Sequence, residues 1–122
     1  MIELDEQEFL KSYNELSDVG FSDSQGYPTE QFLQLIQRWN HNHIRLCFNS
    51  MRQVWHMPDW GWREADIEVK GQRIREYNIS TGGWSGNEDI IFALENNIVI
   101  WNICWVQSRR GGHYIFELKD WN

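Results

Sequence analysis

Apolar residues in the first half of the chain recur every three or four positions, which is the spacing of one face of a helix. The first run predicts a helix over Glu6–Leu16, and Asp5 followed by Glu8 resembles a capping box at its start. Pro28 marks the entry to a second helix, and a third helical run stops before Pro58. This half of the chain is therefore expected to be mainly helical.

The second half changes from helical spacing to runs rich in β-branched and aromatic residues, which favour strands. One helix is expected within it, because Ser85 followed by Glu88 forms a second capping box and Asn96 suits a helix end. The predicted strands are Ala65–Val69, Gln72–Ser80, Ile98–Val106 and His113–Leu118, of which the last two would form a hairpin.

These elements predict a single α+β domain over residues 1–122. The N-terminal helices, within residues 1–56, would pack on a small mixed β-sheet, and residues 64–118 would supply its β-α-β-β half. The sheet is expected to be mixed because a strand–helix–strand crossover between Gln72 and Val106 returns the chain to a parallel strand.

Glycines gather in the loops of this second half. Five of the nine glycines fall into two clusters, Gly82, Gly83 and Gly86 in the first, Gly111 and Gly112 in the second. If the strands ending at Ser80 and starting at Ile98 are parallel, their carboxyl ends share one edge of the sheet, where the 86–96 helix begins. We therefore predict that the clusters converge at that edge, whereas an antiparallel arrangement would separate them.

Such a site would suit a phosphorylated or nucleotide-like small molecule. Backbone N–H groups at a helix start attract anions, and glycine lets a ligand approach the backbone. Arg109 and Arg110 add forked donors for phosphate or carboxylate, and Trp84 with His113 would shape the rim. The predicted ligand-binding residues are Thr81, Gly82, Gly83, Trp84, Ser85, Gly86, Asn87, Glu88, Arg109, Arg110 and His113.

A purely structural role for these residues is the alternative. Glu88 and Asp89 in the first helical turn would repel a phosphate, and the sequence lacks the Gly-Lys-Ser/Thr ending of a phosphate-binding loop. An arginine of the second cluster should reach the neighbourhood of Ser85 or Glu88. A pocket between them favours a ligand, whereas a dry salt bridge favours the structural alternative.

Catalytic and metal chemistry are only weakly indicated. Ser85 lies in a Gly-Trp-Ser-Gly-Asn turn that resembles a nucleophile elbow, but Asn87 replaces the final glycine and a helix N-cap explains Ser85 as well. His41, His43 and Cys47 fit no standard zinc spacing. We therefore assign no catalytic residue, no metal and no cofactor.

Charge is unevenly distributed along the chain. The net charge is −7, from 11 basic and 18 acidic residues, and the whole imbalance lies in the first 30 residues, where Lys11 is the only base. The basic stripe typical of nucleic-acid binding is missing, so no direct nucleic-acid binding is expected. The acidic segment would either keep the surface solvated or meet a basic protein partner.

Composition sets the remaining expectations. Aromatic residues make up 15% of the chain, and this content argues against disorder. Two of the eight tryptophans, Trp60 and Trp62, would either stack on a ligand or pack helices onto the sheet. No apolar run reaches the roughly 18 residues of a membrane span. Two cysteines make no disulfide framework, so a cytoplasmic protein without a membrane segment is expected.

Three strings in the second half are distinctive: TGGWSGNE at residues 81–88, CW at 104–105 and SRRGGHY at 108–114. Together they resemble a group of small uncharacterised proteins from bacteriophages and prophages. The resemblance covers roughly residues 55–118, and no activity is attached to it. It implies action in a bacterial host cytoplasm, where small phage proteins often antagonise host defence.

Two hypotheses of function follow. The first is a non-enzymatic phage-type binding protein with a pocket for a phosphorylated or nucleotide-like small molecule, antagonising host defence signalling. The second is an acidic inhibitor or immunity-like protein that engages a basic protein surface through its N-terminal helix. An enzyme using Ser85 or His113 is a third possibility, for which the sequence indicates no substrate.

Overall fold

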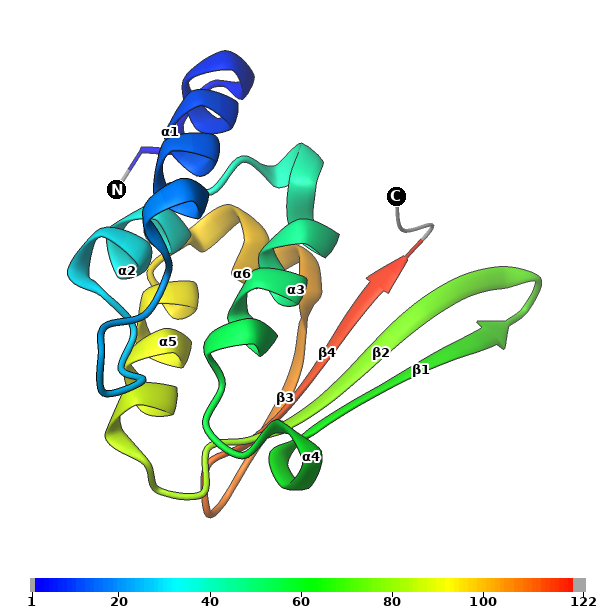
Figure 1. Cartoon of the computed structure of the whole chain (residues 1–122). Helices are drawn as coiled ribbons and strands as arrows, with labels where there is room; N and C mark the ends of the chain where they lie inside the picture. Colours follow the sequence, from blue (N-terminus) through cyan, green and yellow to red (C-terminus); the bar gives the residue numbers. More distant parts are fainter. Residues whose placement is uncertain (1, 120–122) are drawn as a thin grey trace.

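The computed structural model describes residues 2–119, which form an α+β fold with the helices gathered on one side of a four-stranded sheet (Figure 1). None of the described helices is long and apolar enough to cross a membrane. In chain order the elements are α1 Glu6–Val19, α2 Glu30–Gln37, a 3₁₀ helix His41–His43, α3 Ile44–Val54, α4 Pro58–Gly61, β1 Trp62–Val69, β2 Gln72–Ser80, α5 Ser85–Glu95, α6 Ile98–Cys104, β3 Trp105–Arg109 and β4 His113–Lys119.

The predicted helices of the first half are confirmed. At the start of α1 the Glu8 amide donates a hydrogen bond of 2.8 Å to Asp5 Oδ1, and this bond lowers the pKa of Asp5. Thr29 caps α2 by accepting a hydrogen bond from the Phe32 amide at 3.2 Å. The polar interruption before α3 forms the 3₁₀ helix. Capping side chains therefore set the starts of α1 and α2.

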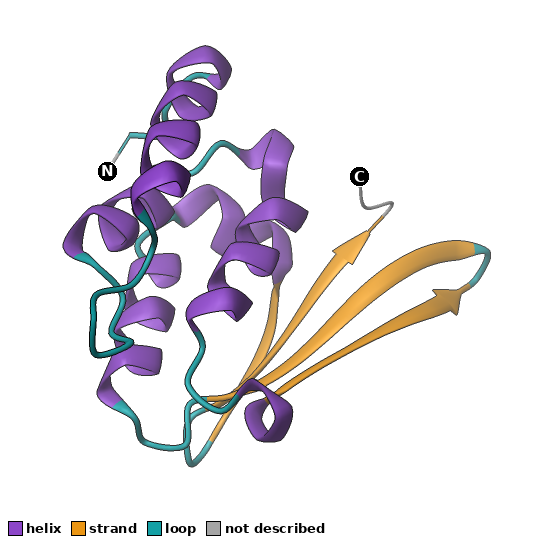
Figure 2. Cartoon of the chain, viewed as in Figure 1, coloured by secondary structure: helices purple, strands orange, loops and turns teal. Residues whose placement is uncertain are grey.

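The sheet is antiparallel throughout, so the prediction of a mixed sheet is wrong. Its strand order is β1-β2-β4-β3, and each neighbouring pair is antiparallel. β2 and β3 point in the same direction, as predicted, but β4 lies between them and pairs antiparallel with both. The β1–β2 hairpin extends beyond the helical layer (Figure 2).

The prediction of one long strand over Ile98–Val106 is also wrong, because most of this segment forms α6 and the strand begins only at Trp105. β-branched residues favour strands locally, but tertiary contacts override that preference. Asn97 caps the helix by accepting a hydrogen bond from the Ile100 amide at 3.1 Å. The helical conformation then buries Ile100 and Cys104 in the core.

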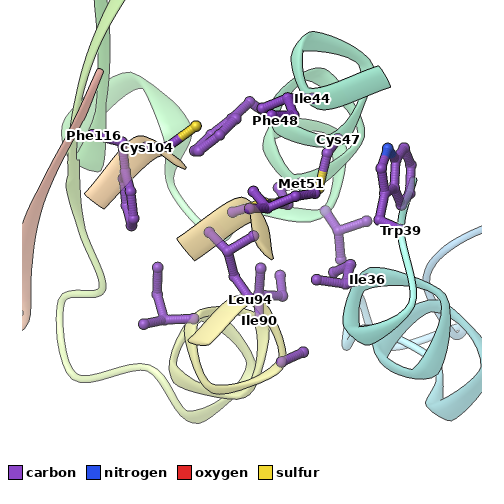
Figure 3. Packing of buried hydrophobic residues seen from close by; sticks show 14 of the residues in the cluster. Ile36, Trp39, Ile44, Cys47, Phe48, Met51, Ile90, Leu94, Cys104 and Phe116 are labelled. Carbon is purple, nitrogen blue, oxygen red and sulfur yellow. Dashed lines mark hydrogen bonds between the residues drawn. The ribbon is translucent and has the colours of Figure 1, made fainter. Parts of the chain in front are cut away.

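The core lies between the helical layer and the sheet. Phe48 and Phe116 are completely buried there, and Phe48 stacks on Tyr77 with ring centroids 4.2 Å apart, whereas Trp39 is completely buried among the helices against Phe9. Both cysteines are free, and burial raises the pKa of the Cys104 thiol to about 12. Figure 3 shows core side chains from α2, α3, α5, α6, β4 and the segment after α2, labelled Ile36, Trp39, Ile44, Cys47, Phe48, Met51, Ile90, Leu94, Cys104 and Phe116.

Asn97 also joins α6 to the end of α2. Its side-chain amide donates hydrogen bonds to the carbonyl oxygens of Ile36 and Trp39 at 3.0 and 3.1 Å, and the residue is buried. Asn97→Ala removes both of these bonds and the cap on the Ile100 amide, although the Ile36 carbonyl keeps its bond from the Trp39 amide at 3.2 Å. We expect the substitution to lower the free energy of unfolding by about 2–4 kcal/mol, as measured by urea denaturation.

The adjacent Asn96→Ala is the matched control. Among residues 2–119, the Asn96 side chain donates to the Phe92 carbonyl alone, in an exposed bond of 2.8 Å. Water can replace that bond, so the expected loss is below about 1 kcal/mol. Equal losses in the two variants would contradict the role given to Asn97.

Candidate functional site

The two glycine clusters meet at one end of the sheet. Ser80, the last residue of β2, pairs with His113, the first residue of β4, and the Thr81 amide donates to the Gly112 carbonyl at 3.0 Å. Figure 1 shows the β2–α5 connection and the β3–β4 turn at this same end. The predicted convergence is confirmed. The expected strand direction is right, because β2 and β3 point the same way, but these strands do not pair with each other, and antiparallel pairing of β2 with β4 joins the two clusters.

Gly112 makes the closest contact between the clusters. A Cβ atom at this position would lie 2.3 Å from the buried Thr81 Oγ1, so only glycine fits. Gly112 also has a φ of 75°, in the left-handed region that glycine tolerates. Its neighbour Gly111 has a similar φ of 84° but no atom within 4 Å of a Cβ. The close approach therefore belongs to Gly112 alone.

A pocket of about 450 Å³ opens beside the first glycine cluster. Trp60, which is 62% exposed, lies against Gly82 and presents its indole to solvent. The pocket thus combines exposed aromatic surface with glycine backbone. Its lining residues are His56, Met57, Trp60, Thr81, Gly82, Gly83 and Trp84.

Trp84 forms a fixed wall of this pocket. Its ring stacks on Tyr27 and on His56, with centroid distances of 4.7 and 4.4 Å. Gly86 permits this position, because a Cβ there would lie 2.3 Å from Trp84 Cζ3. Ring contacts already hold Trp84, so the exposed surface of Trp60 is the better platform for a stacked ligand.

Met57, which also lines the pocket, has a strained backbone conformation. Its φ of 57° lies in the left-handed region, which costs a non-glycine residue about 1–3 kcal/mol. Its carbonyl oxygen accepts hydrogen bonds from the Trp60 and Gly61 amides at 3.1 and 3.0 Å, and these bonds fix the turn into α4. Strain of this kind often accompanies functional sites.

Asn87 is hydrogen-bonded to two residues that line the pocket. It is 1% exposed, and its side-chain oxygen accepts a hydrogen bond from the His56 amide at 2.8 Å. Its side-chain nitrogen donates to the carbonyl oxygens of His56 and Thr81, each at 3.1 Å. These bonds join the α3–α4 connection to the β2–α5 connection, and they use both the oxygen and the nitrogen of the Asn87 side chain.

Three further predicted residues lie outside the pocket lining. Ser85 is exposed in the first turn of α5, where Trp84 is the N-cap and makes no side-chain capping bond, so the capping box at Ser85 and Glu88 is wrong. Glu88 is exposed on the same turn. His113 Nδ1 lies 2.6 Å from Ser80 Oγ and forms a hydrogen bond across the β2–β4 pair.

Arg109 and Arg110 are exposed at the β3–β4 turn. Among residues 2–119, neither arginine forms an ion pair with Glu88 or Asp89, so the dry salt bridge of the structural alternative is not found. They do not line the pocket either. Their turn is joined to the pocket through Gly112 and the lining residue Thr81.

The residues considered for a metal site serve other roles. His41 Nδ1 lies 2.8 Å from Glu3 Oε1, and His43 Nε2 lies 2.9 Å from Glu6 Oε1. Cys47 is buried in the core. Within the described chain, no three potential ligands come together to hold a metal ion.

Several acids of the N-terminal segment also serve local structure. Besides Glu3 and Glu6, Asp5 caps α1 and Asp23 accepts hydrogen bonds from the Gln25 and Tyr27 amides. Glu30 also accepts a hydrogen bond from the Gln34 side chain at 3.3 Å, so local structure accounts for five of the eight acids among the first 30 residues. The engagement of a basic protein by this segment remains a hypothesis.

Sequence reasoning did not place His56, Met57 or Tyr27 at this site. The connector that carries Trp60 and Trp62 was the one sequence feature that pointed to this part of the site. The structure gives the two tryptophans different environments. Trp62 is 3% exposed and packs edge-on against Trp55, with centroids 5.3 Å apart, whereas Trp60 lines the pocket. Nothing in the short sequence around Trp60 and Trp62 distinguishes the tryptophan that lines the pocket from the one that packs in the core.

No protein-family model, curated protein or solved structure matches this chain. The geometry of the pocket and of the neighbouring turn is therefore the basis for a functional proposal.

Gly112→Ala and Gly111→Ala form a matched pair that tests the contact between the clusters. Both glycines have positive φ, so alanine at either position should cost about 1 kcal/mol of stability. Only Gly112→Ala adds a clash with Thr81, which should cost about 1–3 kcal/mol more. Urea denaturation measures the difference, and equal losses would show that Gly112 does not pack on Thr81.

Proposed function

We propose that this protein is a non-enzymatic binding protein whose pocket beside Gly82 and Gly83 takes a phosphorylated or nucleotide-like small molecule. One observation carries the proposal: an exposed indole and glycine backbone share a cavity that adjoins a turn with two exposed arginines. The cavity volume of about 450 Å³ lies within the range of roughly 300–1,000 Å³ typical of small-molecule sites.

The aromatic part of the pocket would hold the planar part of the ligand. Trp60 offers an exposed ring face, and stacking a base on such a ring contributes about 1–3 kcal/mol. Trp84, fixed by Tyr27 and His56, would form the opposing wall. A wall that is already ordered loses little entropy on binding, which favours affinity.

The glycines and arginines would hold the anionic part. Gly82 exposes its backbone at the pocket, where a ligand oxygen can approach closely. Arg109 and Arg110 lie on the turn that the Thr81–Gly112 hydrogen bond attaches to the pocket. Guanidinium groups bind phosphate through paired hydrogen bonds, so the ligand would extend from the indole toward this turn.

The same end of the sheet gives less support to catalysis. Ser80 and His113 form a nucleophile–base contact of 2.6 Å. A catalytic triad also needs an acidic group that orients the histidine. Among the described residues, no carboxylate is hydrogen-bonded to the His113 ring, which favours a binding function over hydrolysis.

The resemblance to phage and prophage proteins suggests a setting for this function. Four of the seven lining residues fall within the distinctive string at residues 81–88, namely Thr81, Gly82, Gly83 and Trp84. In that setting the protein would sequester a signalling nucleotide in the bacterial host cytoplasm and so antagonise host defence signalling. No cofactor is required for this role.

A panel of mono-, di- and cyclic nucleotides in thermal-shift and calorimetric titrations tests the proposal. A bound nucleotide present at about a hundred times its Kd should stabilise the fold by about 2.7 kcal/mol. Trp60→Ala should weaken binding by about 5- to 150-fold, because it removes the stacking platform. Phe92→Ala, which removes an equally exposed aromatic ring from α5, should leave the Kd unchanged.

The double variant Arg109→Ala, Arg110→Ala tests the anionic subsite. It should weaken phosphorylated ligands while leaving the corresponding nucleosides at their original affinity, because only the phosphate contacts are lost. The proposal is overturned if no nucleotide in the panel stabilises the wild-type protein, or if Trp60→Ala binds as tightly as Phe92→Ala.

A further inference from the structure

The four histidines of the chain differ in what their rings contact. In three of them, His41, His43 and His113, a ring nitrogen lies 2.6–2.9 Å from a carboxylate or hydroxyl oxygen. His56 has no such contact: within residues 2–119, neither of its ring nitrogens takes part in a hydrogen bond or an ion pair. Its ring nitrogens are therefore open to a ligand, and the residue lines the pocket.

Two sets of contacts fix where the His56 ring lies. The Asn87 side chain bonds both backbone groups of His56, accepting from its amide at 2.8 Å and donating to its carbonyl at 3.1 Å. The ring stacks on Trp84 at a centroid distance of 4.4 Å and an interplanar angle of 26°. A ring that is already held in place loses little entropy when it binds a ligand.

His56 is also the one residue in the described pocket lining that can carry a charge. The other lining residues are Met57, Trp60, Thr81, Gly82, Gly83 and Trp84. Arg109 and Arg110 lie on the neighbouring turn, outside the lining. A protonated imidazole donates hydrogen bonds from both nitrogens, which suits the oxygens of a phosphate.

The segments around His56 do not supply another cation for this position. Their ionisable side chains are all exposed, namely Asp23, Tyr27, Arg52, Asp59, Glu88 and Asp89. The single base among them, Arg52, lies 3.5 Å from Glu64. None of these side chains forms an ion pair with His56 in the part of the chain that the structure describes. An anion inside the pocket would therefore depend on the His56 ring for a positive charge.

We infer that His56, in its protonated form, binds a phosphate of the ligand inside the pocket, so that ligand affinity is higher at acidic than at alkaline pH. The inference rests on the proposed function, because it requires a phosphorylated ligand in this pocket. Histidine is the side chain whose ordinary pKa lies between about pH 5 and 8, whereas arginine stays charged throughout that range. A role limited to packing on Trp84 gives no reason for ligand affinity to follow pH.

Calorimetric titrations at about pH 5 and pH 8 test the inference. The probes are the nucleotide of the panel that binds the wild type most tightly and the nucleoside with the same base. His56→Gln keeps a neutral hydrogen-bonding side chain and removes the charge. At the acidic limit the nucleotide Kd of this variant should exceed that of the wild type by about 10- to 150-fold, because a charged hydrogen bond is lost. At the alkaline limit the two values should agree within about 2-fold, since both side chains are then neutral.

The ratio of the two Kd values isolates the histidine, because ionisation of the nucleotide itself affects both proteins equally. The nucleoside should bind both proteins alike at either pH, since it has no phosphate. His41→Gln is the matched control: His41 is also exposed, but its ring contacts Glu3 and does not line the pocket. This variant should reproduce the wild-type Kd at both limits, and circular dichroism checks that each variant is folded.

The possible failures are distinguishable. A nucleotide that binds the wild type, with a Kd ratio for His56→Gln that is the same at both limits, overturns this inference and leaves the proposed function standing. Loss of the pH dependence in His113→Gln instead of His56→Gln also overturns it, because the charge would then belong to the β3–β4 turn. If no nucleotide of the panel binds the wild type, the proposed function and this inference are both overturned.

Discussion

The side-chain amide of Asn87 sets the geometry on which the pocket depends. It bridges the α3–α4 and β2–α5 connections through bonds to His56 and Thr81, and the His56 ring stacks on Trp84 between the same two connections. A primary amide both donates and accepts, so neither a carboxylate nor an aliphatic side chain could replace it. The strained turn at Met57 is held between this bridge and α4. This buried residue therefore helps to fix the loop before Trp60 and the loop that contains Gly82 and Gly83.

Much of the fold could be predicted from the spacing of apolar residues, because the helices α1 to α3 and the strands β1, β2 and β4 each satisfy their own local pattern. The segment that became α6 could not. Its β-branched residues favour a strand, and the helix forms because Asn97 meets the backbone at Ile36, 61 positions away in the chain. Local propensity contains no information about a partner so distant.

The candidate site was predictable to a similar extent. Glycines beside polar residues marked both loops, and their convergence followed from strand direction even though the pairing was misassigned. The part of the pocket formed by His56, Met57 and Trp60 could not be predicted from the sequence. It depends on the hydrogen bonds of the Asn87 side chain and on a left-handed backbone conformation at Met57, which a non-glycine residue rarely adopts. Likewise, only the packed core explains why Trp62 is buried and Trp60 is not.

The pairing of β2 with β4 has a consequence for the order in which the chain assembles. Each of the two hairpins closes over a short turn, whereas their junction joins Ser80 to His113 across 33 positions. Closing so long a loop costs entropy before any contact offsets it, although α5 and α6 shorten the loop once they form. The hairpins and helices can thus form early from local contacts, and we expect the meeting of β2 with β4 to be the slow step in folding. The pocket lies at this junction, so we expect it to form only in the last step of folding.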